Sequence, residues 1–89
     1  MRYVSVMVSH SPDAGRESRS HFSYQDTLQL SDLETAREFA FQALKDGSFQ
    51  KGFIRVAFPE TATYHFRFER AGILGYNLTQ TRQYPQGVA

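Results

Sequence analysis

The sequence predicts one small α+β domain, in which a four-stranded antiparallel sheet carries a single helix on one face. Four short segments alternate apolar and polar residues, as strands with one buried face do. One further segment repeats apolar residues at helical spacing. The segments follow one another in the order β-β-α-β-β. Packing the helix on the apolar face of the sheet is the physical solution for such an order.

Two strands are expected in the N-terminal third of the chain. Residues 3–8 alternate, with three valines on one face, and residues 21–30 alternate again. The apolar members of the second segment are Phe22, Tyr24, Leu28 and Leu30. Asp26 interrupts this apolar face, which predicts a bulge or an edge position. Residues 10–20 are rich in turn formers, and we expect a mobile loop there.

A helix is expected over residues 32–46. Ser31 and Glu34 have the spacing of a capping box, in which each side chain bonds to the backbone amide of the other residue. Lys45 in the last turn suits the helix dipole, and Gly47 supplies a stop. The apolar positions of the helix that share one arc are Leu33, Ala36, Phe39, Ala40, Ala43 and Leu44.

The C-terminal half predicts an antiparallel hairpin. Residues 52–58 and 62–68 both alternate, and the three residues Pro59, Glu60 and Thr61 join them. After Gly72 the pattern weakens, and two interpretations of residues 73–80 remain open, a short fifth strand and a packed extended segment. The hairpin of residues 52–58 and 62–68 is thus the part of the sequence that most clearly predicts which side chains point to each face of the sheet.

Composition bounds the molecule further. Eighty-nine residues make one domain, expected to span residues 1–80, with residues 81–89 as a flexible tail. Eight Phe and five Tyr supply a core, and the absence of Cys favours the cytoplasm. No apolar run suits a signal peptide or a membrane span. The net charge of +1 argues against a strongly basic nucleic-acid binder and against an acidic nucleic-acid mimic.

A single helix covers one side of a sheet, so the outward side chains are candidates for binding. Phe53, Arg55, His65 and Arg67 are expected to be cross-strand neighbours, and binding surfaces are enriched in aromatic residues and Arg. The full set of candidate binding residues is Phe53, Arg55, His65, Arg67, Tyr3, Arg16 and Arg19. The competing interpretation is an ordinary solvated face with incidental cations.

One segment resembles a known motif. Lys51 to Phe58 is similar to the longer signature strand of RNA-recognition-motif domains, matching it at Lys51, Gly52, Phe53, Val56 and Phe58. Ile54 stands where that pattern has a small residue, and Arg55 stands where it has a second stacking aromatic. A guanidinium plane also stacks on bases. The family's fold has two helices in β-α-β-β-α-β order, whereas one helix is predicted here, so the resemblance is confined to this strand.

The leading functional hypothesis is a small non-enzymatic binding protein that acts through the open sheet face, the 10–20 loop, or both. By analogy of size and layout, such proteins include bacterial or phage accessory and inhibitor proteins that block a macromolecular partner. A protein is the expected partner, and no membrane, cofactor or metal is expected. A homodimer, in which a second copy covers an apolar strip of Phe53, Tyr3 and Met7, is a further possibility.

Two alternatives stay open. The open face and its basic arm are compatible with single-stranded nucleic acid. A small ribonuclease could be built from His65, Arg67, Tyr64 and Arg55. The three histidines have no metal-ligand spacing, and the sequence has neither a phosphate-binding loop nor a nucleophile elbow.

Overall fold

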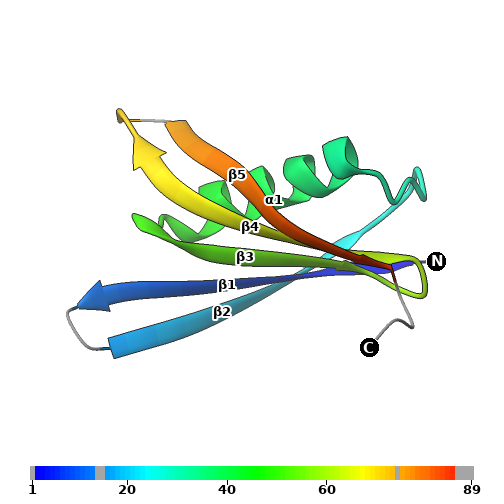
Figure 1. The fold of residues 1–89 in the computed structure, drawn as a ribbon, viewed down its shortest axis with the longest axis horizontal. Helices are drawn as coiled ribbons and strands as arrows, with labels where there is room; N and C mark the ends of the chain where they lie inside the picture. The colour runs from blue at the N-terminus through cyan, green and yellow to red at the C-terminus, as the bar shows by residue number, and fades with distance from the viewer. Residues whose placement is uncertain (1, 14–15, 74, 86–89) are drawn as a thin grey trace.

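The computed structural model describes residues 2–13, 16–73 and 75–85, with side chains for residues 2–10, 18–73 and 75–81. Its elements are β1 (Tyr3–Asp13), β2 (Arg16–Gln25), α1 (Leu33–Gly47), β3 (Lys51–Phe58), β4 (Ala62–Ala71) and β5 (Gly75–Pro85). The strands form one antiparallel sheet in the order β2-β1-β3-β4-β5, and α1 lies behind it (Figure 1). The predicted α+β class with one helix is therefore confirmed, and the sheet has five strands.

The helix covers one face of the sheet because alternate residues of the central strands are apolar. It packs across β1, β2 and β3, and its three buried alanines let the backbone approach the sheet closely. The buried core consists of Val4, Val6, Val8, Ala36, Ala40, Ala43, Leu44, Phe49, Ile54, Val56, Phe58, Ala62, Tyr64, Phe66, Phe68 and Leu78. Every strand except β2 contributes a residue to this list, and β2 adds two half-buried rings packed against it.

The helix begins one residue later than the capping box predicted. Asp32 is the N-cap, and its carboxylate accepts a hydrogen bond from the amide of Thr35 at 2.9 Å. The Ser31 hydroxyl instead accepts from Arg2 and from Thr61, so it is committed to tertiary contacts. At the other end Gly47 is the last helical residue, and Ser48 takes the left-handed cap conformation.

Asp26 ends β2 and explains why the predicted second strand is wrong beyond residue 25. Its amide donates to the carbonyl of Arg2, while its carboxylate accepts from the Arg2 guanidinium and from the amide of Gln29. These bonds turn the chain out of the sheet. Leu28 and Leu30, expected inside, are consequently exposed. A carboxylate 3% exposed is tolerable here because it is paired and hydrogen-bonded.

The first hairpin is longer than the sequence indicates. The expected loop over residues 10–20 is wrong for its described part, because β1 continues to Asp13 and β2 starts at Arg16. The ladder pairs Ser9 with Arg19 and His10 with Ser18, and its register shifts between His10 and Asp13. The apolar alternation disappears in this region because the helix does not reach it, so sequence periodicity cannot reveal the strands.

The last strand resolves the alternatives for residues 73–80. β5 runs from Gly75 to Pro85 as a full edge strand beside β4, so the predicted boundary at residue 80 falls inside it. The expected tail is thus strand up to Pro85, and residues 86–89 lie outside the described part. Within the described residues, no helix has the length and apolar character needed to cross a membrane.

A candidate binding face on the open side of the sheet

The outward side chains stand in rows that run across the strands. One row places Arg19, Ser9, Phe53, Arg67 and Thr79 opposite one another, from β2 to β5. The next row has His21, Met7, Arg55 and His65, followed on β5 by Arg82 as a register position. Each neighbour in a row is separated from the next by one strand spacing, about 4.8 Å.

The structure brings together the four residues expected to cluster. Phe53 is the direct partner of Arg67 across β3 and β4, and Arg55 is the direct partner of His65. Phe53 is 57% exposed, both arginines are exposed, and His65 is half-buried. Neither Arg55 nor Arg67 has a hydrogen-bond or ion-pair partner among the side chains that the structure describes. Both guanidinium groups thus retain their donors for an external acceptor.

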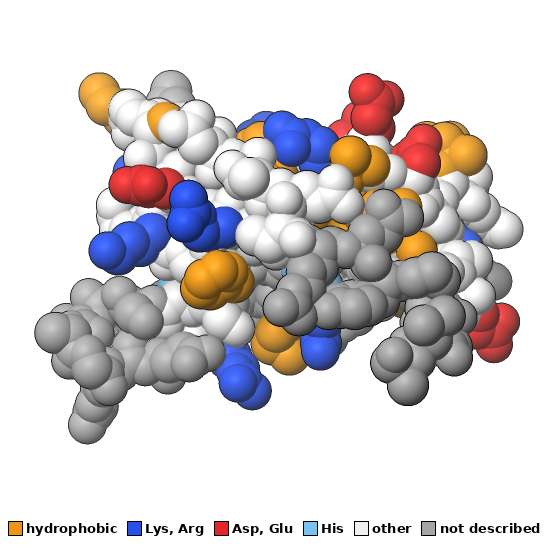
Figure 2. All heavy atoms as spheres, viewed as in Figure 1, with side chains coloured by type: hydrophobic (Ala, Val, Ile, Leu, Met, Phe, Trp, Pro, Cys, Tyr) orange, Lys and Arg blue, Asp and Glu red, His pale blue; other side chains and the backbone are white. Residues whose placement is uncertain are grey.

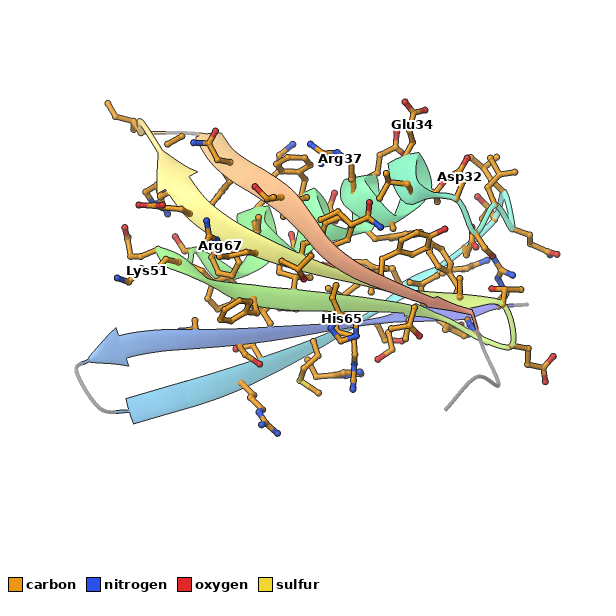
Figure 3. The ribbon with its side chains drawn as sticks, in the orientation of Figure 1. Asp32, Glu34, Arg37, Lys51, His65 and Arg67 are labelled. Carbon is orange, nitrogen blue, oxygen red and sulfur yellow. The ribbon has the colours of Figure 1, made fainter. Side chains whose placement is uncertain are left out.

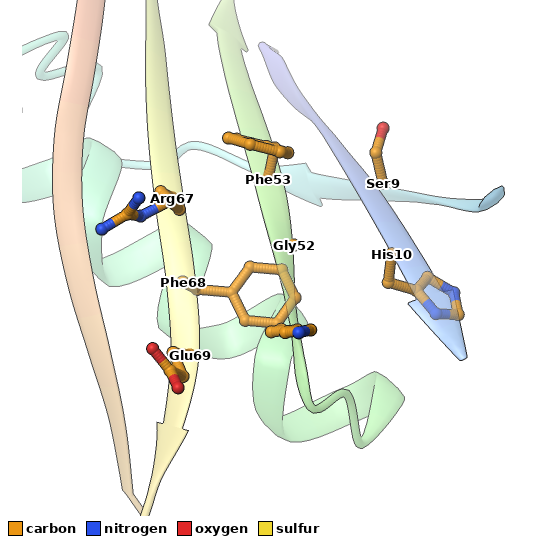
Figure 4. Close-up of a pocket in the computed structure, with 8 residues that line it drawn as sticks. Ser9, His10, Gly52, Phe53, Arg67, Phe68 and Glu69 are labelled. Carbon is orange, nitrogen blue, oxygen red and sulfur yellow. The ribbon is translucent and has the colours of Figure 1, made fainter. Parts of the chain in front are cut away.

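Phe53 stands between two hollows. The larger, of about 420 Å³, lies toward the start of β3; Ser9, Lys51 and Arg67 border it from the open face, and it extends past Gly52 to His10 and Phe68 of the covered side (Figure 4). The smaller, of about 220 Å³, lies toward Met7, Arg55 and His65. Ser9 and Phe53 border both of them. The Phe53 ring therefore separates two spaces along β3.

Gly52 positions this ring. Its φ of 154° is unfavourable for residues with a side chain, and a Cβ there would lie 2.1 Å from the backbone oxygen of Ser9. The glycine therefore lets β1 and β3 approach at the point where Phe53 enters the sheet. Its register partner His10 belongs to the covered side, where the imidazole lies 4.6 Å from the Phe49 ring.

Among the described side chains, the open face carries more positive charge than the net charge of +1 suggests. Among described outward positions of the strands, four cations stand against the single carboxylate of Glu69: Arg19, Lys51, Arg55 and Arg67. Helix α1 and its N-cap carry more acids than bases: Asp32, Glu34, Glu38 and Asp46 against Arg37 and Lys45. In Figure 2, Lys and Arg side chains lie beside an acidic side chain near the left end of the open face, and further Lys and Arg side chains lie toward its upper and lower edges. In Figure 3, Lys51 and Arg67 lie far from Asp32 and Glu34.

Some predicted site residues lie elsewhere. Tyr3 is outward and 53% exposed, but it lies six positions along β1 from Ser9, the neighbour of Phe53, a distance of roughly 20 Å. The proposed apolar strip of Tyr3, Met7 and Phe53 is therefore not continuous. Arg19 does join the Phe53 row, whereas the side chain of Arg16 lies outside the described residues.

The ribonuclease constellation is not assembled as expected. Tyr64 is 4% exposed, and its hydroxyl donates to the carbonyl of Ser31 on the covered side of the sheet. It cannot act beside His65, because successive residues of a strand point to opposite faces. Within the described residues, no group of His, Asp and Glu gathers in the number needed to hold a metal ion.

The open face also carries a Ser–His pair that the sequence does not predict. The Ser5 hydroxyl oxygen lies 2.6 Å from Nε2 of His21, on the open face. A Ser–His pair becomes an effective nucleophile when a third group orients the imidazole. No described acidic side chain hydrogen-bonds to His21, and neither residue borders the hollows beside Phe53. This geometry gives a surface hydrogen bond without the remainder of a catalytic site.

Two residues of the face, Ser9 and Lys51, were missed at the sequence level. Each lies one position outside a predicted strand, because the sequence predicts strands over residues 3–8 and 52–58, whereas β1 and β3 extend further. In β1 and β3 the outward residues are odd-numbered, so continuing that alternation to the next odd position predicts Ser9 and Lys51 on the open face. Thr79 depends on the register between β4 and β5, which no local sequence signal encodes.

Comparisons of the chain with protein-family models, with curated proteins and with solved structures found no match. The fold and the site define an α+β protein with one helix-covered sheet face and one basic open face. We therefore argue its function from the geometry and chemistry of that face.

Proposed function

We propose that this protein is a non-enzymatic binding protein, and that its open sheet face holds a macromolecular partner of negative charge. The observation that carries the proposal is the row in which Phe53 and Arg67 stand directly opposite each other, with Arg55 beside them. Aromatic and Arg side chains at the centre of a patch are the residues that dominate binding energies.

Binding fits these side chains better than catalysis. The two arginines present fixed forks of N–H donors that match carboxylate or phosphate oxygens. Phe53 adds apolar area that a partner can cover. A catalytic role would need a base, an orienting group and an oxyanion donor around one point. We therefore assign recognition to this face and no reaction.

Such a protein would act by occupying a surface of its partner. A small accessory or inhibitor protein of a bacterium or a phage works in this way when it blocks a larger complex, and we retain that role as part of the proposal. The excess of cations on the face favours a partner of negative charge. Electrostatic complementarity of this kind sets partner choice and association rate more than affinity.

The test is an NMR titration of the ¹⁵N-labelled protein with two polyanions, twelve-residue oligothymidylate and poly-L-glutamate. At low salt, at least one should shift the amide resonances of the rows around Phe53, and the amides of α1 should not respond. Arg67→Glu should abolish the shifts. Lys45→Glu is the matched control, because it reverses a single exposed charge on the helix instead. The proposal is overturned if neither polyanion binds, or if the shifts map to α1.

A further inference from the structure

We propose that the occupant of this face is single-stranded nucleic acid, with a base stacked on Phe53 and the backbone phosphates held by Arg55 and Arg67. The inference rests on the proposed function, since it names the class of polyanion that the face accepts. It draws on three observations: the exposed ring, the hollows on both sides of it, and the placement of the cations.

The exposed ring is the first observation. Phe53 keeps 57% of its surface in water although it lies on a central strand, between β1 and β4. On the same strand Phe58 is fully buried. An exposed aromatic ring within a positively charged face is the arrangement on which successive bases stack, because every base offers a π face.

The two hollows are the second observation. They border Phe53 toward Lys51 on one side and toward Arg55 on the other. Flat groups can therefore lie beside the ring in either direction along β3. A nucleic-acid strand supplies flat bases between charged phosphates, whereas an acidic peptide supplies carboxylates without planar rings. The hollows thus favour nucleic acid over an acidic protein.

The placement of the cations is the third observation. Arg67 lies directly opposite Phe53, and Arg55 follows two residues along β3 on the same face. Both can reach phosphates that flank a base on the ring. Glu69 stands in register with Lys51 at the larger hollow and offsets the charge of Lys51, whereas no described carboxylate borders the smaller hollow beside Arg55. The phosphates should therefore lie toward Arg55.

The strand must be single because of the ring's position. In a duplex the base faces are already stacked, so Phe53 could contact only backbone and groove edges. A single strand can turn its bases onto the ring, and stacking is tolerant of sequence. With two to four phosphates contacted, the logarithm of the association constant should fall against the logarithm of salt with a slope of about −1.4 to −2.8.

The experiment measures fluorescence anisotropy of labelled twelve-residue oligothymidylate and oligouridylate with the intact protein. Both should bind at low salt. Phe53→Ala should weaken binding about tenfold or more, whereas Phe53→Trp should retain it. Phe53→Leu keeps the apolar bulk without a π face, so it should resemble the alanine variant. Tyr3→Ala removes a second exposed ring among the described residues of the face and should change affinity less than twofold. Circular dichroism confirms that each variant is folded.

Three outcomes would overturn the inference. The first is an absence of single-strand binding while poly-L-glutamate still shifts the open-face amides. In that case the proposed function stands and the partner is an acidic protein. The second is equal binding of a matched duplex with no effect of Phe53→Ala, which removes the stacking contact. The third is an equal loss in Tyr3→Ala, which removes the assignment to Phe53. If neither polyanion binds, the proposed function fails as well.

Discussion

The two faces of strand β3 differ in almost every physical respect. Ile54, Val56 and Phe58 point toward α1 and are at most 1% exposed, whereas Phe53 and Arg55 point away from it and are exposed. Neighbouring residues of one strand thus have opposite roles because the backbone turns each side chain to the other face. The covered face holds the buried core of the domain, and the open face is the one to which we assign recognition in the proposed function.

The largest effect expected from this comparison is on folding stability. Phe58→Ala should lower the free energy of unfolding by about 3–5 kcal/mol, because it removes a fully buried ring and leaves a cavity. Phe53→Ala should change it by at most about 0.5 kcal/mol, as for most exposed positions. Urea denaturation followed by circular dichroism measures both. Similar losses in the two variants would contradict the division between the faces.

The next effect concerns charge. Asp26→Ala leaves the Arg2 guanidinium without its carboxylate partner inside the covered side. We expect a loss of about 3 kcal/mol, the low end for breaking a buried pair, since Arg2 keeps some contact with water. Glu69→Ala, an exposed carboxylate on the open face, is the control and should cost less than about 1 kcal/mol. Thermal unfolding of the two variants measures both losses, and an equal loss would contradict a special role for the Arg2–Asp26 pair.

A smaller effect is expected where the two faces meet. Gly52→Ala combines an unfavourable φ with a clash against the Ser9 backbone, and should cost about 2 kcal/mol or more. Gly72→Ala has a φ of 71° but open space around the added Cβ, so it should cost about 1 kcal/mol. Chemical denaturation compares them. An equal cost would show that backbone conformation alone matters at Gly52.

The smallest effect is a pH dependence at the helix start, on the acidic side of the molecule. The hydrogen bonds that Asp32 accepts from Thr35, side chain first and then backbone, hold its pKa below the ordinary value of 3.8. Its contribution to stability is therefore full above pH 3.8 and is lost as the pH falls through the lower folded pKa. Asp32→Asn keeps a good cap without this titration. Its melting temperature should fall less steeply than that of the native protein on acidification below pH 4.

The sequence revealed the elements that carry a buried face. In β1, α1, β3 and β4, one side of the element is buried and the other is exposed. The spacing of their apolar residues in the sequence therefore follows the packing. The outer part of the first hairpin and the end of β5 lack that contrast, and the sequence instead predicts a loop over residues 10–20 and a flexible tail over residues 81–89. Leu28 and Leu30 continue the apolar alternation of the sequence but lie outside the strand. The hydrogen bonds of Asp26 end the pairing of β1 with β2 before these residues are reached.

The candidate site was predictable in part for the same reason. Phe53, Arg55, His65 and Arg67 follow from the parity of two strands joined by a short turn, which fixes their register. Ser9 and Arg19 need the pairing of β1 with β2 and β3, which is a property of the whole chain. The excess of cations on the open face was hidden because a net charge sums all side chains regardless of where the fold places them.

Among the described residues, the excess of cations on the open face stands against an excess of acids on α1 and its N-cap. In the field of a polyanion, the protein will turn its open face forward before contact, so a larger fraction of encounters is productive. The rate of association, more than the lifetime of the complex, should then fall as salt is added. A chain with almost no net charge can in this way be drawn to one kind of surface in one orientation.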